Sequence, residues 1–300
     1  MKKIVVTGAT SMLGVAMIEE CLRNDIEVVA IVHRNSKNIS RLPKSPKLQV
    51  IKMNFDEFEN YIPNFNDADV FYHFAWAATN RTERENLDIQ ESNIGYTLDA
   101  VRLAKKCGCQ KFIFAGSQSE YGLSDKPLNR ETPIRPITAY GVSKFAAGKL
   151  AEILCNSLGI TFVWARILSL YGINDRENNL TYYLINCFKN NVSPVLTDCE
   201  QIWDYLYEDD AAHAFKLLGQ CQTCGVYVIG NGNGVPLKSY VETIYNLIKP
   251  NVPLIFGGKP YTKNQVMHLV ADITDLKRDT GFEPQISFEE GISKILDSHK

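Results

Sequence analysis

Two residues four positions apart have the chemistry for proton transfer. Tyr140 and Lys144 lie in the stretch Ala139-Tyr-Gly-Val-Ser-Lys144, which begins a segment with helical spacing, and residues four apart share one face of a helix. A tyrosine hydroxyl has an ordinary pKa of about 10, and a neighbouring ammonium favours its phenolate form. The pair could therefore exchange a proton with a sugar hydroxyl or a ketone while a nicotinamide exchanges a hydride.

A second stretch, Phe114-Ala-Gly-Ser-Gln-Ser-Glu-Tyr-Gly122, offers hydroxyls at Ser117 and Ser119 with Gln118 between them. An amide and a hydroxyl do not act as general acid or base near neutral pH. These positions therefore disfavour elimination of water from a sugar, which needs an acid and a base in addition to Tyr140. Glu120 comes one residue later. Side chains alternate along an extended segment, which predicts that Glu120 faces away from Ser119 as a surface or hydrogen-bonding carboxylate.

A glycine turn near the N-terminus is typical of a phosphate site. Thr7-Gly-Ala-Thr-Ser-Met-Leu-Gly14 follows an apolar run and opens a helical segment, and a dinucleotide pyrophosphate binds at such a helix N-terminus. Gly8 permits the tight turn, and Gly14 permits close packing of helix and sheet. Ser11 replaces the middle glycine of the usual pattern, and its hydroxyl could donate to a pyrophosphate oxygen.

The end of the second predicted strand, Ile31-Val-His-Arg-Asn-Ser-Lys37, indicates which dinucleotide binds. An acidic residue there would accept a hydrogen bond from the ribose of NAD, but this segment is basic and contains no carboxylate that would compete. Arg34, with Lys37 and His33, could pair with a 2'-phosphate. The sequence therefore favours NADP(H) and leaves NAD(H) possible.

Strands alternate with helices over the first half of the chain, which predicts an α/β fold with a doubly wound parallel sheet of the Rossmann type. After about residue 170 the rhythm loosens, so we expect a dinucleotide-binding domain over 1–167 and a smaller, mixed, mainly substrate-binding domain over 168–300, with some segments returning to the sheet. The expected strands are 3–7, 27–32, 48–53, 70–74, 111–115 and 161–167, and the expected helices are 12–24, 92–107 and 138–158.

Composition excludes several classes of protein. The formal net charge of −2, with 32 basic and 34 acidic residues, gives no basic stripe for nucleic acid, and no apolar run is long enough for a membrane span. Cys221-Gln-Thr-Cys224 has the spacing of half a zinc site, but the other half is missing. We expect no metal, reduced thiols and a cytoplasmic location.

Together these motifs resemble the extended short-chain dehydrogenase/reductases, the group of nucleotide-sugar epimerases, dehydratases and reductases. The resemblance covers nearly the whole chain and adds Asn93, which is similar to a structural asparagine beneath the active site. It rests on the glycine turn, Gly116-Ser117 through Tyr121-Gly122, Tyr140 with Lys144, Val70-Phe-Tyr-His-Phe-Ala75, Arg166 with Tyr171-Gly172, and Trp203-Asp-Tyr-Leu-Tyr-Glu-Asp-Asp210.

The resemblance implies a role for each matching residue. Ser117, four residues before Tyr121, would bind the reacting oxygen; Tyr140 would be the general acid/base; Lys144 would hold the nicotinamide ribose. The implied cofactor residues are Gly8, Thr10, Ser11, Met12, Leu13, Gly14, Asn54, Phe55, Phe74, Ala75, Trp76, Tyr140 and Lys144, to which the basic segment adds His33, Arg34 and Lys37. The implied substrate residues are Ala78, Gln118, Ser119, Arg166, Ser169, Arg176 and Trp203.

One departure from the family affects the substrate site. Trp203 stands where many relatives have an arginine that grips the nucleotide-sugar phosphates, so Arg166 or Arg176 would have to substitute. Trp203 could stack on a base or sugar, or fill the core.

The stretch Gly116–Gly122 also resembles reductases such as the CDP-abequose and CDP-paratose synthases. This resemblance, with the basic region at Arg34, implies NADP(H)-dependent reduction of a 4-keto-6-deoxy nucleotide sugar. A nucleotide-sugar 4-epimerase and a non-catalytic dinucleotide sensor remain alternatives. The resemblance also implies a homodimer formed through a four-helix bundle.

Overall fold

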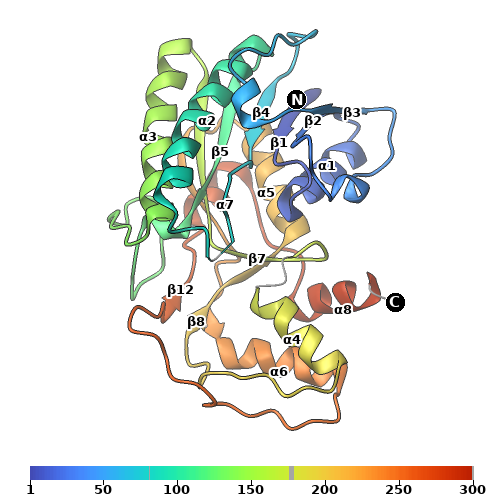
Figure 1. Cartoon of the computed structure of the whole chain (residues 1–300), viewed down its shortest axis with the longest axis vertical. Coiled ribbons are helices and arrows are strands. Elements are labelled where there is room, and N and C mark those ends of the chain that lie inside the picture. The colour runs from blue at the N-terminus through green and yellow to red at the C-terminus, as the bar shows by residue number, and fades with distance from the viewer. Residues whose placement is uncertain (81, 176–178, 299–300) are drawn as a thin grey trace.

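A parallel sheet of seven strands forms the centre of the molecule (Figure 1). The computed structural model describes residues 1–80, 82–175 and 179–298. The strands lie in the order β3-β2-β1-β4-β5-β6-β10. The first three are added toward one edge of the sheet and the later ones toward the other, and this change between β1 and β4 confirms the predicted Rossmann fold. Their bounds are β1 Lys3–Thr7, β2 Glu27–Val32, β3 Leu48–Lys52, β4 Val70–His73, β5 Lys111–Ser117, β6 Thr161–Ile167 and β10 Gly225–Ile229.

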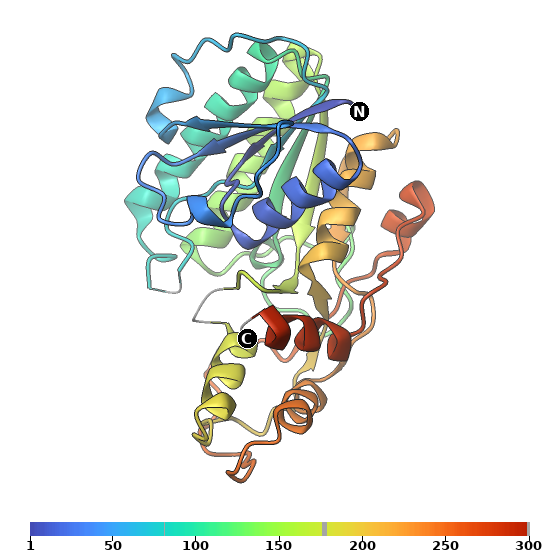
Figure 2. The ribbon, with the colours of Figure 1, turned by 90° about the vertical axis from the view of Figure 1, so that its right-hand side faces the viewer.

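Helices cover both faces of this sheet (Figure 2). Residues of α1, α5 and α7 share one apolar cluster with the strands, and residues of α2 and α3 share the other. The bounds are α1 Met12–Arg23, α2 Leu87–Lys106, α3 Ala139–Leu158, α5 Glu208–Gln220 and α7 Thr274–Thr280. Helix α2 begins five residues before its predicted start because Asn86 caps it, accepting a hydrogen bond from Ile89 N at 3.2 Å.

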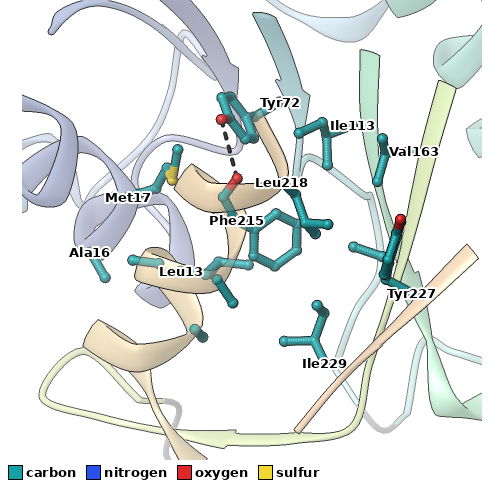
Figure 3. Packing of buried hydrophobic residues seen from close by; sticks show 14 of the residues in the cluster. Leu13, Ala16, Met17, Tyr72, Ile113, Val163, Phe215, Leu218, Tyr227 and Ile229 are labelled. Atoms are coloured by element: carbon teal, nitrogen blue, oxygen red, sulfur yellow. Dashed lines mark hydrogen bonds between the residues drawn. The ribbon is translucent and has the colours of Figure 1, made fainter. Parts of the chain in front are cut away.

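Helix α5 packs against the sheet through buried apolar side chains (Figure 3). Phe215 is fully buried between α1 and the strands, and burial of such a ring contributes about 2–3 kcal/mol. The Tyr72 hydroxyl donates to the Phe215 carbonyl at 3.2 Å. The one polar atom that Tyr72 takes into this core is therefore satisfied.

The remaining elements form a smaller lobe below the carboxyl ends of the strands (Figure 1). It contains a three-stranded sheet, β11-β8-β12, and a parallel pair, β7-β9. Its aromatic centre includes Tyr171, Tyr205, Tyr240 and Phe288, whose rings contact one another. The bounds are β7 Ser169–Tyr171, β8 Ile202–Trp203, β9 Tyr205–Tyr207, β11 Val235–Pro236, β12 His268–Leu269, α4 Leu180–Lys189, α6 Leu237–Ile248 and α8 Phe288–Ser298.

Within the described residues, single-turn 3-10 helices lie in loops of the sheet domain, namely η1 Ile39–Arg41, η2 Phe55–Glu57 and η3 Gln118–Glu120. Across the described ranges, every helix is too short or too polar to cross a membrane.

Candidate active site

The glycine turn between β1 and α1 is built for close approach. Gly8 has φ +67°, and a Cβ atom there would lie 2.7 Å from Ala75 N. A Cβ on Gly14 would collide with the Gly8 carbonyl. Ser11 caps α1, its Oγ accepting from Gly14 N at 3.1 Å. The cap satisfies Gly14 N, and α1 begins at the carboxyl end of β1, where a pyrophosphate could approach the N-terminus of the helix.

This turn forms one wall of a cavity of about 720 Å³, which we call the loop cavity. Its volume suits a ligand of dinucleotide size, since drug-sized ligands occupy several hundred Å³. Several residues predicted to bind the cofactor line it, namely Gly8, Thr10, Ser11, Met12, His33, Phe55, Phe74, Ala75 and Trp76. The lining residues that were not predicted include Asn38 and Arg41, which come from the loop after β2.

Arg34 was predicted to bind the cofactor, but it is not in the lining of the loop cavity. Its guanidinium makes two bonds to Glu57, at 2.8 Å from Nε and 2.5 Å from Nη2. We expected no competing carboxylate because none is near Arg34 in sequence; Glu57 is 23 residues away and reaches it through η2. Asn54 caps that turn and accepts from Arg34 N at 3.3 Å. It therefore connects η2 to the segment after β2 and is not itself in the cavity lining. Lys37 is exposed outside the lining.

A second cavity, of about 470 Å³, adjoins the first; we call it the tyrosine cavity. Ser117, Tyr140 and Lys144, the three predicted catalytic residues, all line it, together with Leu13 from α1 and Ser169 from β7. The residues common to both cavities are Ser11, Met12, Phe74, Trp76, Thr79 and Asp175. A ligand bound along the loop cavity can therefore extend to Tyr140.

Lys144 is buried between aromatic rings at the floor of the tyrosine cavity. Its Nζ donates to the Ala115 carbonyl at 2.8 Å and lies 3.8 Å from the centre of the Trp76 ring. Burial lowers the pKa of Lys144 to about 7, against the opposing influence of Glu120. Trp76 also packs edge-on against Tyr140, with ring centres 6.0 Å apart. Lys144 and Tyr140 therefore share one aromatic wall.

Two side chains of α2 fix this wall. Gln90 accepts from Trp76 Nε1 at 2.9 Å, and Asn93 accepts from Ala77 N at 2.8 Å and donates to Ala77 O at 3.1 Å. These bonds hold the segment after β4 against α2, as the resemblance implied for Asn93. Ala78, predicted to contact substrate, lines neither cavity; it has φ +56°, and its carbonyl instead accepts from Gln90 at 3.0 Å.

The segment after Ser117 turns instead of continuing as a strand. The 3-10 helix η3 places Gln118 in the tyrosine cavity, while successive residues of such a helix point about 120° apart. Ser119, predicted to line the site, is in the lining of neither cavity; its Oγ accepts from Gln118 Nε2 at 3.3 Å, and its carbonyl lies against Gly141 of α3. The turn itself is held by Glu120, which accepts from Ser117 N at 2.7 Å.

Arg166 was predicted to bind substrate, but it is not in the lining of the tyrosine cavity. It is 3% exposed, donates to Glu120 at 2.7 Å and lies between the Tyr121 and Trp164 rings. Glu120 is itself fully buried, and this burial raises its pKa despite the arginine beside it. A buried charge requires a partner, so Arg166 and Glu120 form a support beneath Ser117.

The lobe below contributes the outer wall of the tyrosine cavity. Trp203 lines it and packs against two apolar clusters, so it both fills core and faces the cavity. Its Nε1 is buried and has no hydrogen-bond partner within the described residues. Arg176, the other predicted phosphate contact, lies outside the described residues.

Several lining residues were missed because they lie in loops, in strands of two or three residues, or at a helix start, where the sequence carries no periodic signal. Of these, Tyr205 could have been found, since it follows Trp203 by two residues in β9 and so repeats its facing. The missed residues of the tyrosine cavity include Thr79, Arg84, Leu170, Asp175, Asn179, Leu180 and Tyr205. In the described part of the chain, no group of three or more histidine, cysteine or acidic side chains could hold a metal ion.

Comparison with known proteins places most of the chain within one family pattern. The model of the NAD dependent epimerase/dehydratase family matches residues 4–230. CDP-abequose synthase from Salmonella typhimurium is 26% identical over 302 residues, covering 98% of this chain and 97% of the relative. dTDP-4-dehydro-6-deoxyglucose reductase from Escherichia coli is 23% identical over 313 residues, covering 98% and 96%. The structure of UDP-glucose 4-epimerase from Thermotoga maritima, with UDP-glucose, has a TM-score of 0.88 at 21% identity and covers 99% and 98%.

Proposed function

Because this chain belongs to the NAD dependent epimerase/dehydratase family and is an NAD(P)-dependent enzyme, we propose that it reduces the 4-keto group of a 6-deoxy nucleotide sugar with NADPH. The observation that carries this proposal is the convergence of Ser117, Tyr140 and Lys144 on one cavity that opens into the loop cavity. When bound, the reduced nicotinamide would supply the hydride. The chain itself would supply the proton and hold the carbonyl.

Each catalytic side chain has one task in this reaction. Ser117 Oγ donates to the carbonyl oxygen of the sugar, and Tyr140 gives its hydroxyl proton to the same oxygen as the carbonyl carbon receives the hydride. The product is an alcohol, and Tyr140 is left as the phenolate until it recovers a proton from solvent. Lys144, while charged, stabilises that phenolate.

Reduction is preferred to dehydration because of what flanks Ser117. Gln118 faces the cavity with an amide, and Glu120 is buried and bonded to Arg166. Neither can serve as the additional acid or base that water elimination requires next to this serine. The similarity to CDP-abequose synthase and dTDP-4-dehydro-6-deoxyglucose reductase points the same way.

We further propose that NADP(H) is the preferred cofactor and that Arg41 is the principal contact of its 2'-phosphate. Arg41 and His33 line the end of the loop cavity that β2 forms. The Thr10 hydroxyl, in the same lining, is hydrogen-bonded to the Ser36 hydroxyl at 3.0 Å, so one of the two can donate to an anion while this bond is kept. The acidic residue in the described lining is Asp175. It comes from the loop after β7 and not from the end of β2, where an acidic residue would bind the ribose of NAD.

The test is an assay of purified protein with NADPH and a panel of 4-keto-6-deoxy sugars linked to CDP, dTDP, GDP and UDP. We expect NADPH consumption with at least one of them. Tyr140→Phe should lower kcat by about 100-fold or more while cofactor binding persists. Tyr245→Phe in α6, a hydroxyl bonded to Val252 O, is the matched control and should leave kcat unchanged.

Other outcomes decide against the reductase. Interconversion of UDP-hexoses without net loss of cofactor would identify the epimerase alternative. Cofactor binding without turnover of any sugar, unaffected by Tyr140→Phe, would identify a dinucleotide sensor.

A further inference from the structure

A second cation lies against Tyr140, and the reaction scheme above does not use it. The guanidinium carbon of Arg84 is 4.7 Å from the centre of the Tyr140 ring. Arg84 Nε donates to Thr79 O at 3.0 Å, and Arg84 O accepts from Tyr140 N at 3.1 Å. The arginine is thus tied at both its side chain and its backbone, and it faces the tyrosine cavity.

Lys144 alone is a weak source of positive charge for Tyr140. Its Nζ is 6.0 Å from the Tyr140 ring centre, farther than the Arg84 guanidinium. Because burial lowers the pKa of Lys144 to about 7, and Arg84 adds to this lowering, the lysine is only partly charged near neutral pH. A guanidinium keeps its charge throughout this range.

We propose that Arg84 is a positioning residue that stabilises the phenolate form of Tyr140 and so makes its hydroxyl a stronger acid. A phenolate spreads its negative charge into the ring, so a cation above the ring face stabilises phenolate more than phenol. The role in turnover rests on the proposed reduction. The effect on the phenolate does not.

Other charged groups also surround Tyr140. On the side of α2, Glu85 accepts from Ala139 N at 3.1 Å at the start of α3, and its charge opposes the phenolate. Asp175 across the cavity opposes it too. Beneath the site, Glu120 and Arg166 are paired, and burial lowers the pKa of His73 to about 3, so this histidine is neutral. Among the described residues, Arg84 is therefore the cation that keeps its charge in this pH range and lies against the Tyr140 ring.

The test follows the ultraviolet absorbance of tyrosinate during a pH titration. Each protein is compared with its own Tyr140→Phe derivative, because the difference isolates one tyrosine. Arg84→Gln should move the Tyr140 step upward by about one pH unit, the shift typical of losing one nearby opposite charge. Arg84→Lys should largely restore it. Arg102→Gln, which removes an exposed arginine paired with Asp99 in α2, is the matched control and should not move it.

Turnover provides a second reading. In reduction Tyr140 must be protonated, so kcat/KM falls as pH rises through its pKa, and Arg84→Gln should move this fall to higher pH. If no sugar is turned over, the proposed function fails, but the titration still tests Arg84. A Tyr140 step that stays in place in folded Arg84→Gln overturns the inference; Arg84→Ala is the second neutral variant if the glutamine variant misfolds. A rise in KM alone, without a shifted step, also overturns it and makes Arg84 a substrate contact.

Discussion

Two arginines near the end of the loop cavity that β2 forms differ in what already binds them. Arg34 makes a bidentate pair with Glu57, and this pairing holds the Glu57 pKa at about 2, so the carboxylate stays charged. Arg41 lines the cavity, and among the described residues its guanidinium makes a 3.4 Å contact from Nη1 to Asn174 O. A 2'-phosphate would have to displace Glu57 to pair with Arg34, whereas Arg41 is available to it.

Replacement of Arg41 should therefore change the choice of cofactor. We expect Arg41→Ala to lower kcat/KM for NADPH by about 10-fold or more, the loss of one charge-assisted contact, with little change for NADH. Arg34→Ala is the control and should reduce the NADPH preference less. Equal losses with both cofactors in Arg41→Ala would refute the assignment, which initial rates with each cofactor measure directly.

The sequence predicted the residues whose chemistry depends on local spacing. Ser117, Tyr140 and Lys144 each lie within a few residues of a strand end or a helix start, and the structure brings them to one cavity. Arg34 and Arg166 were misplaced for a common reason. Each is bound by a carboxylate distant in sequence, Glu57 or Glu120, and such pairings depend on tertiary structure.

Among the elements, α5 begins with an unusual buried acid. Glu208 is 4% exposed; its Oε1 accepts from Ile173 N at 2.7 Å, while Oε2 has no partner in the described part of the chain. Burial raises the pKa of Glu208 to about 8. The unfolded chain releases this proton near its ordinary pKa of 4.5, so between the two values the native state alone holds it and stability falls as pH rises.

Glu208→Gln removes this titration. The variant should gain thermal stability over the wild type as pH rises from about 5 to about 8, reaching several degrees of Tm, and the gain should then level off. Thermal unfolding at a series of pH values measures it. Glu242→Gln in α6, an exposed glutamate, should show a constant difference. A Glu208→Gln gain that shrinks with pH would contradict the assigned protonation.

Element boundaries also show what periodicity could predict. The first six strands and three helices follow from apolar runs and helical spacing, and the observed bounds differ by a few residues at most, apart from α2. The η3 turn after β5 was missed, because Ser117 and Glu120 close it through a reciprocal cap that is stabilised by Arg166 on another strand. The two small sheets have strands of two or three residues, too short for a periodic pattern.

At the scale of the whole molecule, α2 and α3 lie side by side on one face of the sheet (Figure 1), and α3 carries an apolar stripe. Val142, Leu150 and Ile153 are 51%, 44% and 64% exposed, and their spacing places them on one side of the helix. Exposed apolar residues that cluster on one helix face indicate an interface. This stripe supports our proposal that two copies pair through α2 and α3 in a four-helix bundle, the isologous contact of a two-fold dimer.

The dimer proposal predicts the effect of a charge on this stripe. Ile153→Asp places a carboxylate at the most exposed position of the stripe, and its counterpart in the second copy would carry the same charge, so burial in the interface would be unfavourable. We expect a dimer for the wild type and a monomer for Ile153→Asp by light scattering at matched concentration. Ile62→Asp, at an 83% exposed position between β3 and β4, should remain dimeric. A monomeric wild type would contradict the proposal, and an Ile153→Asp variant that still dimerises would place the interface on another face.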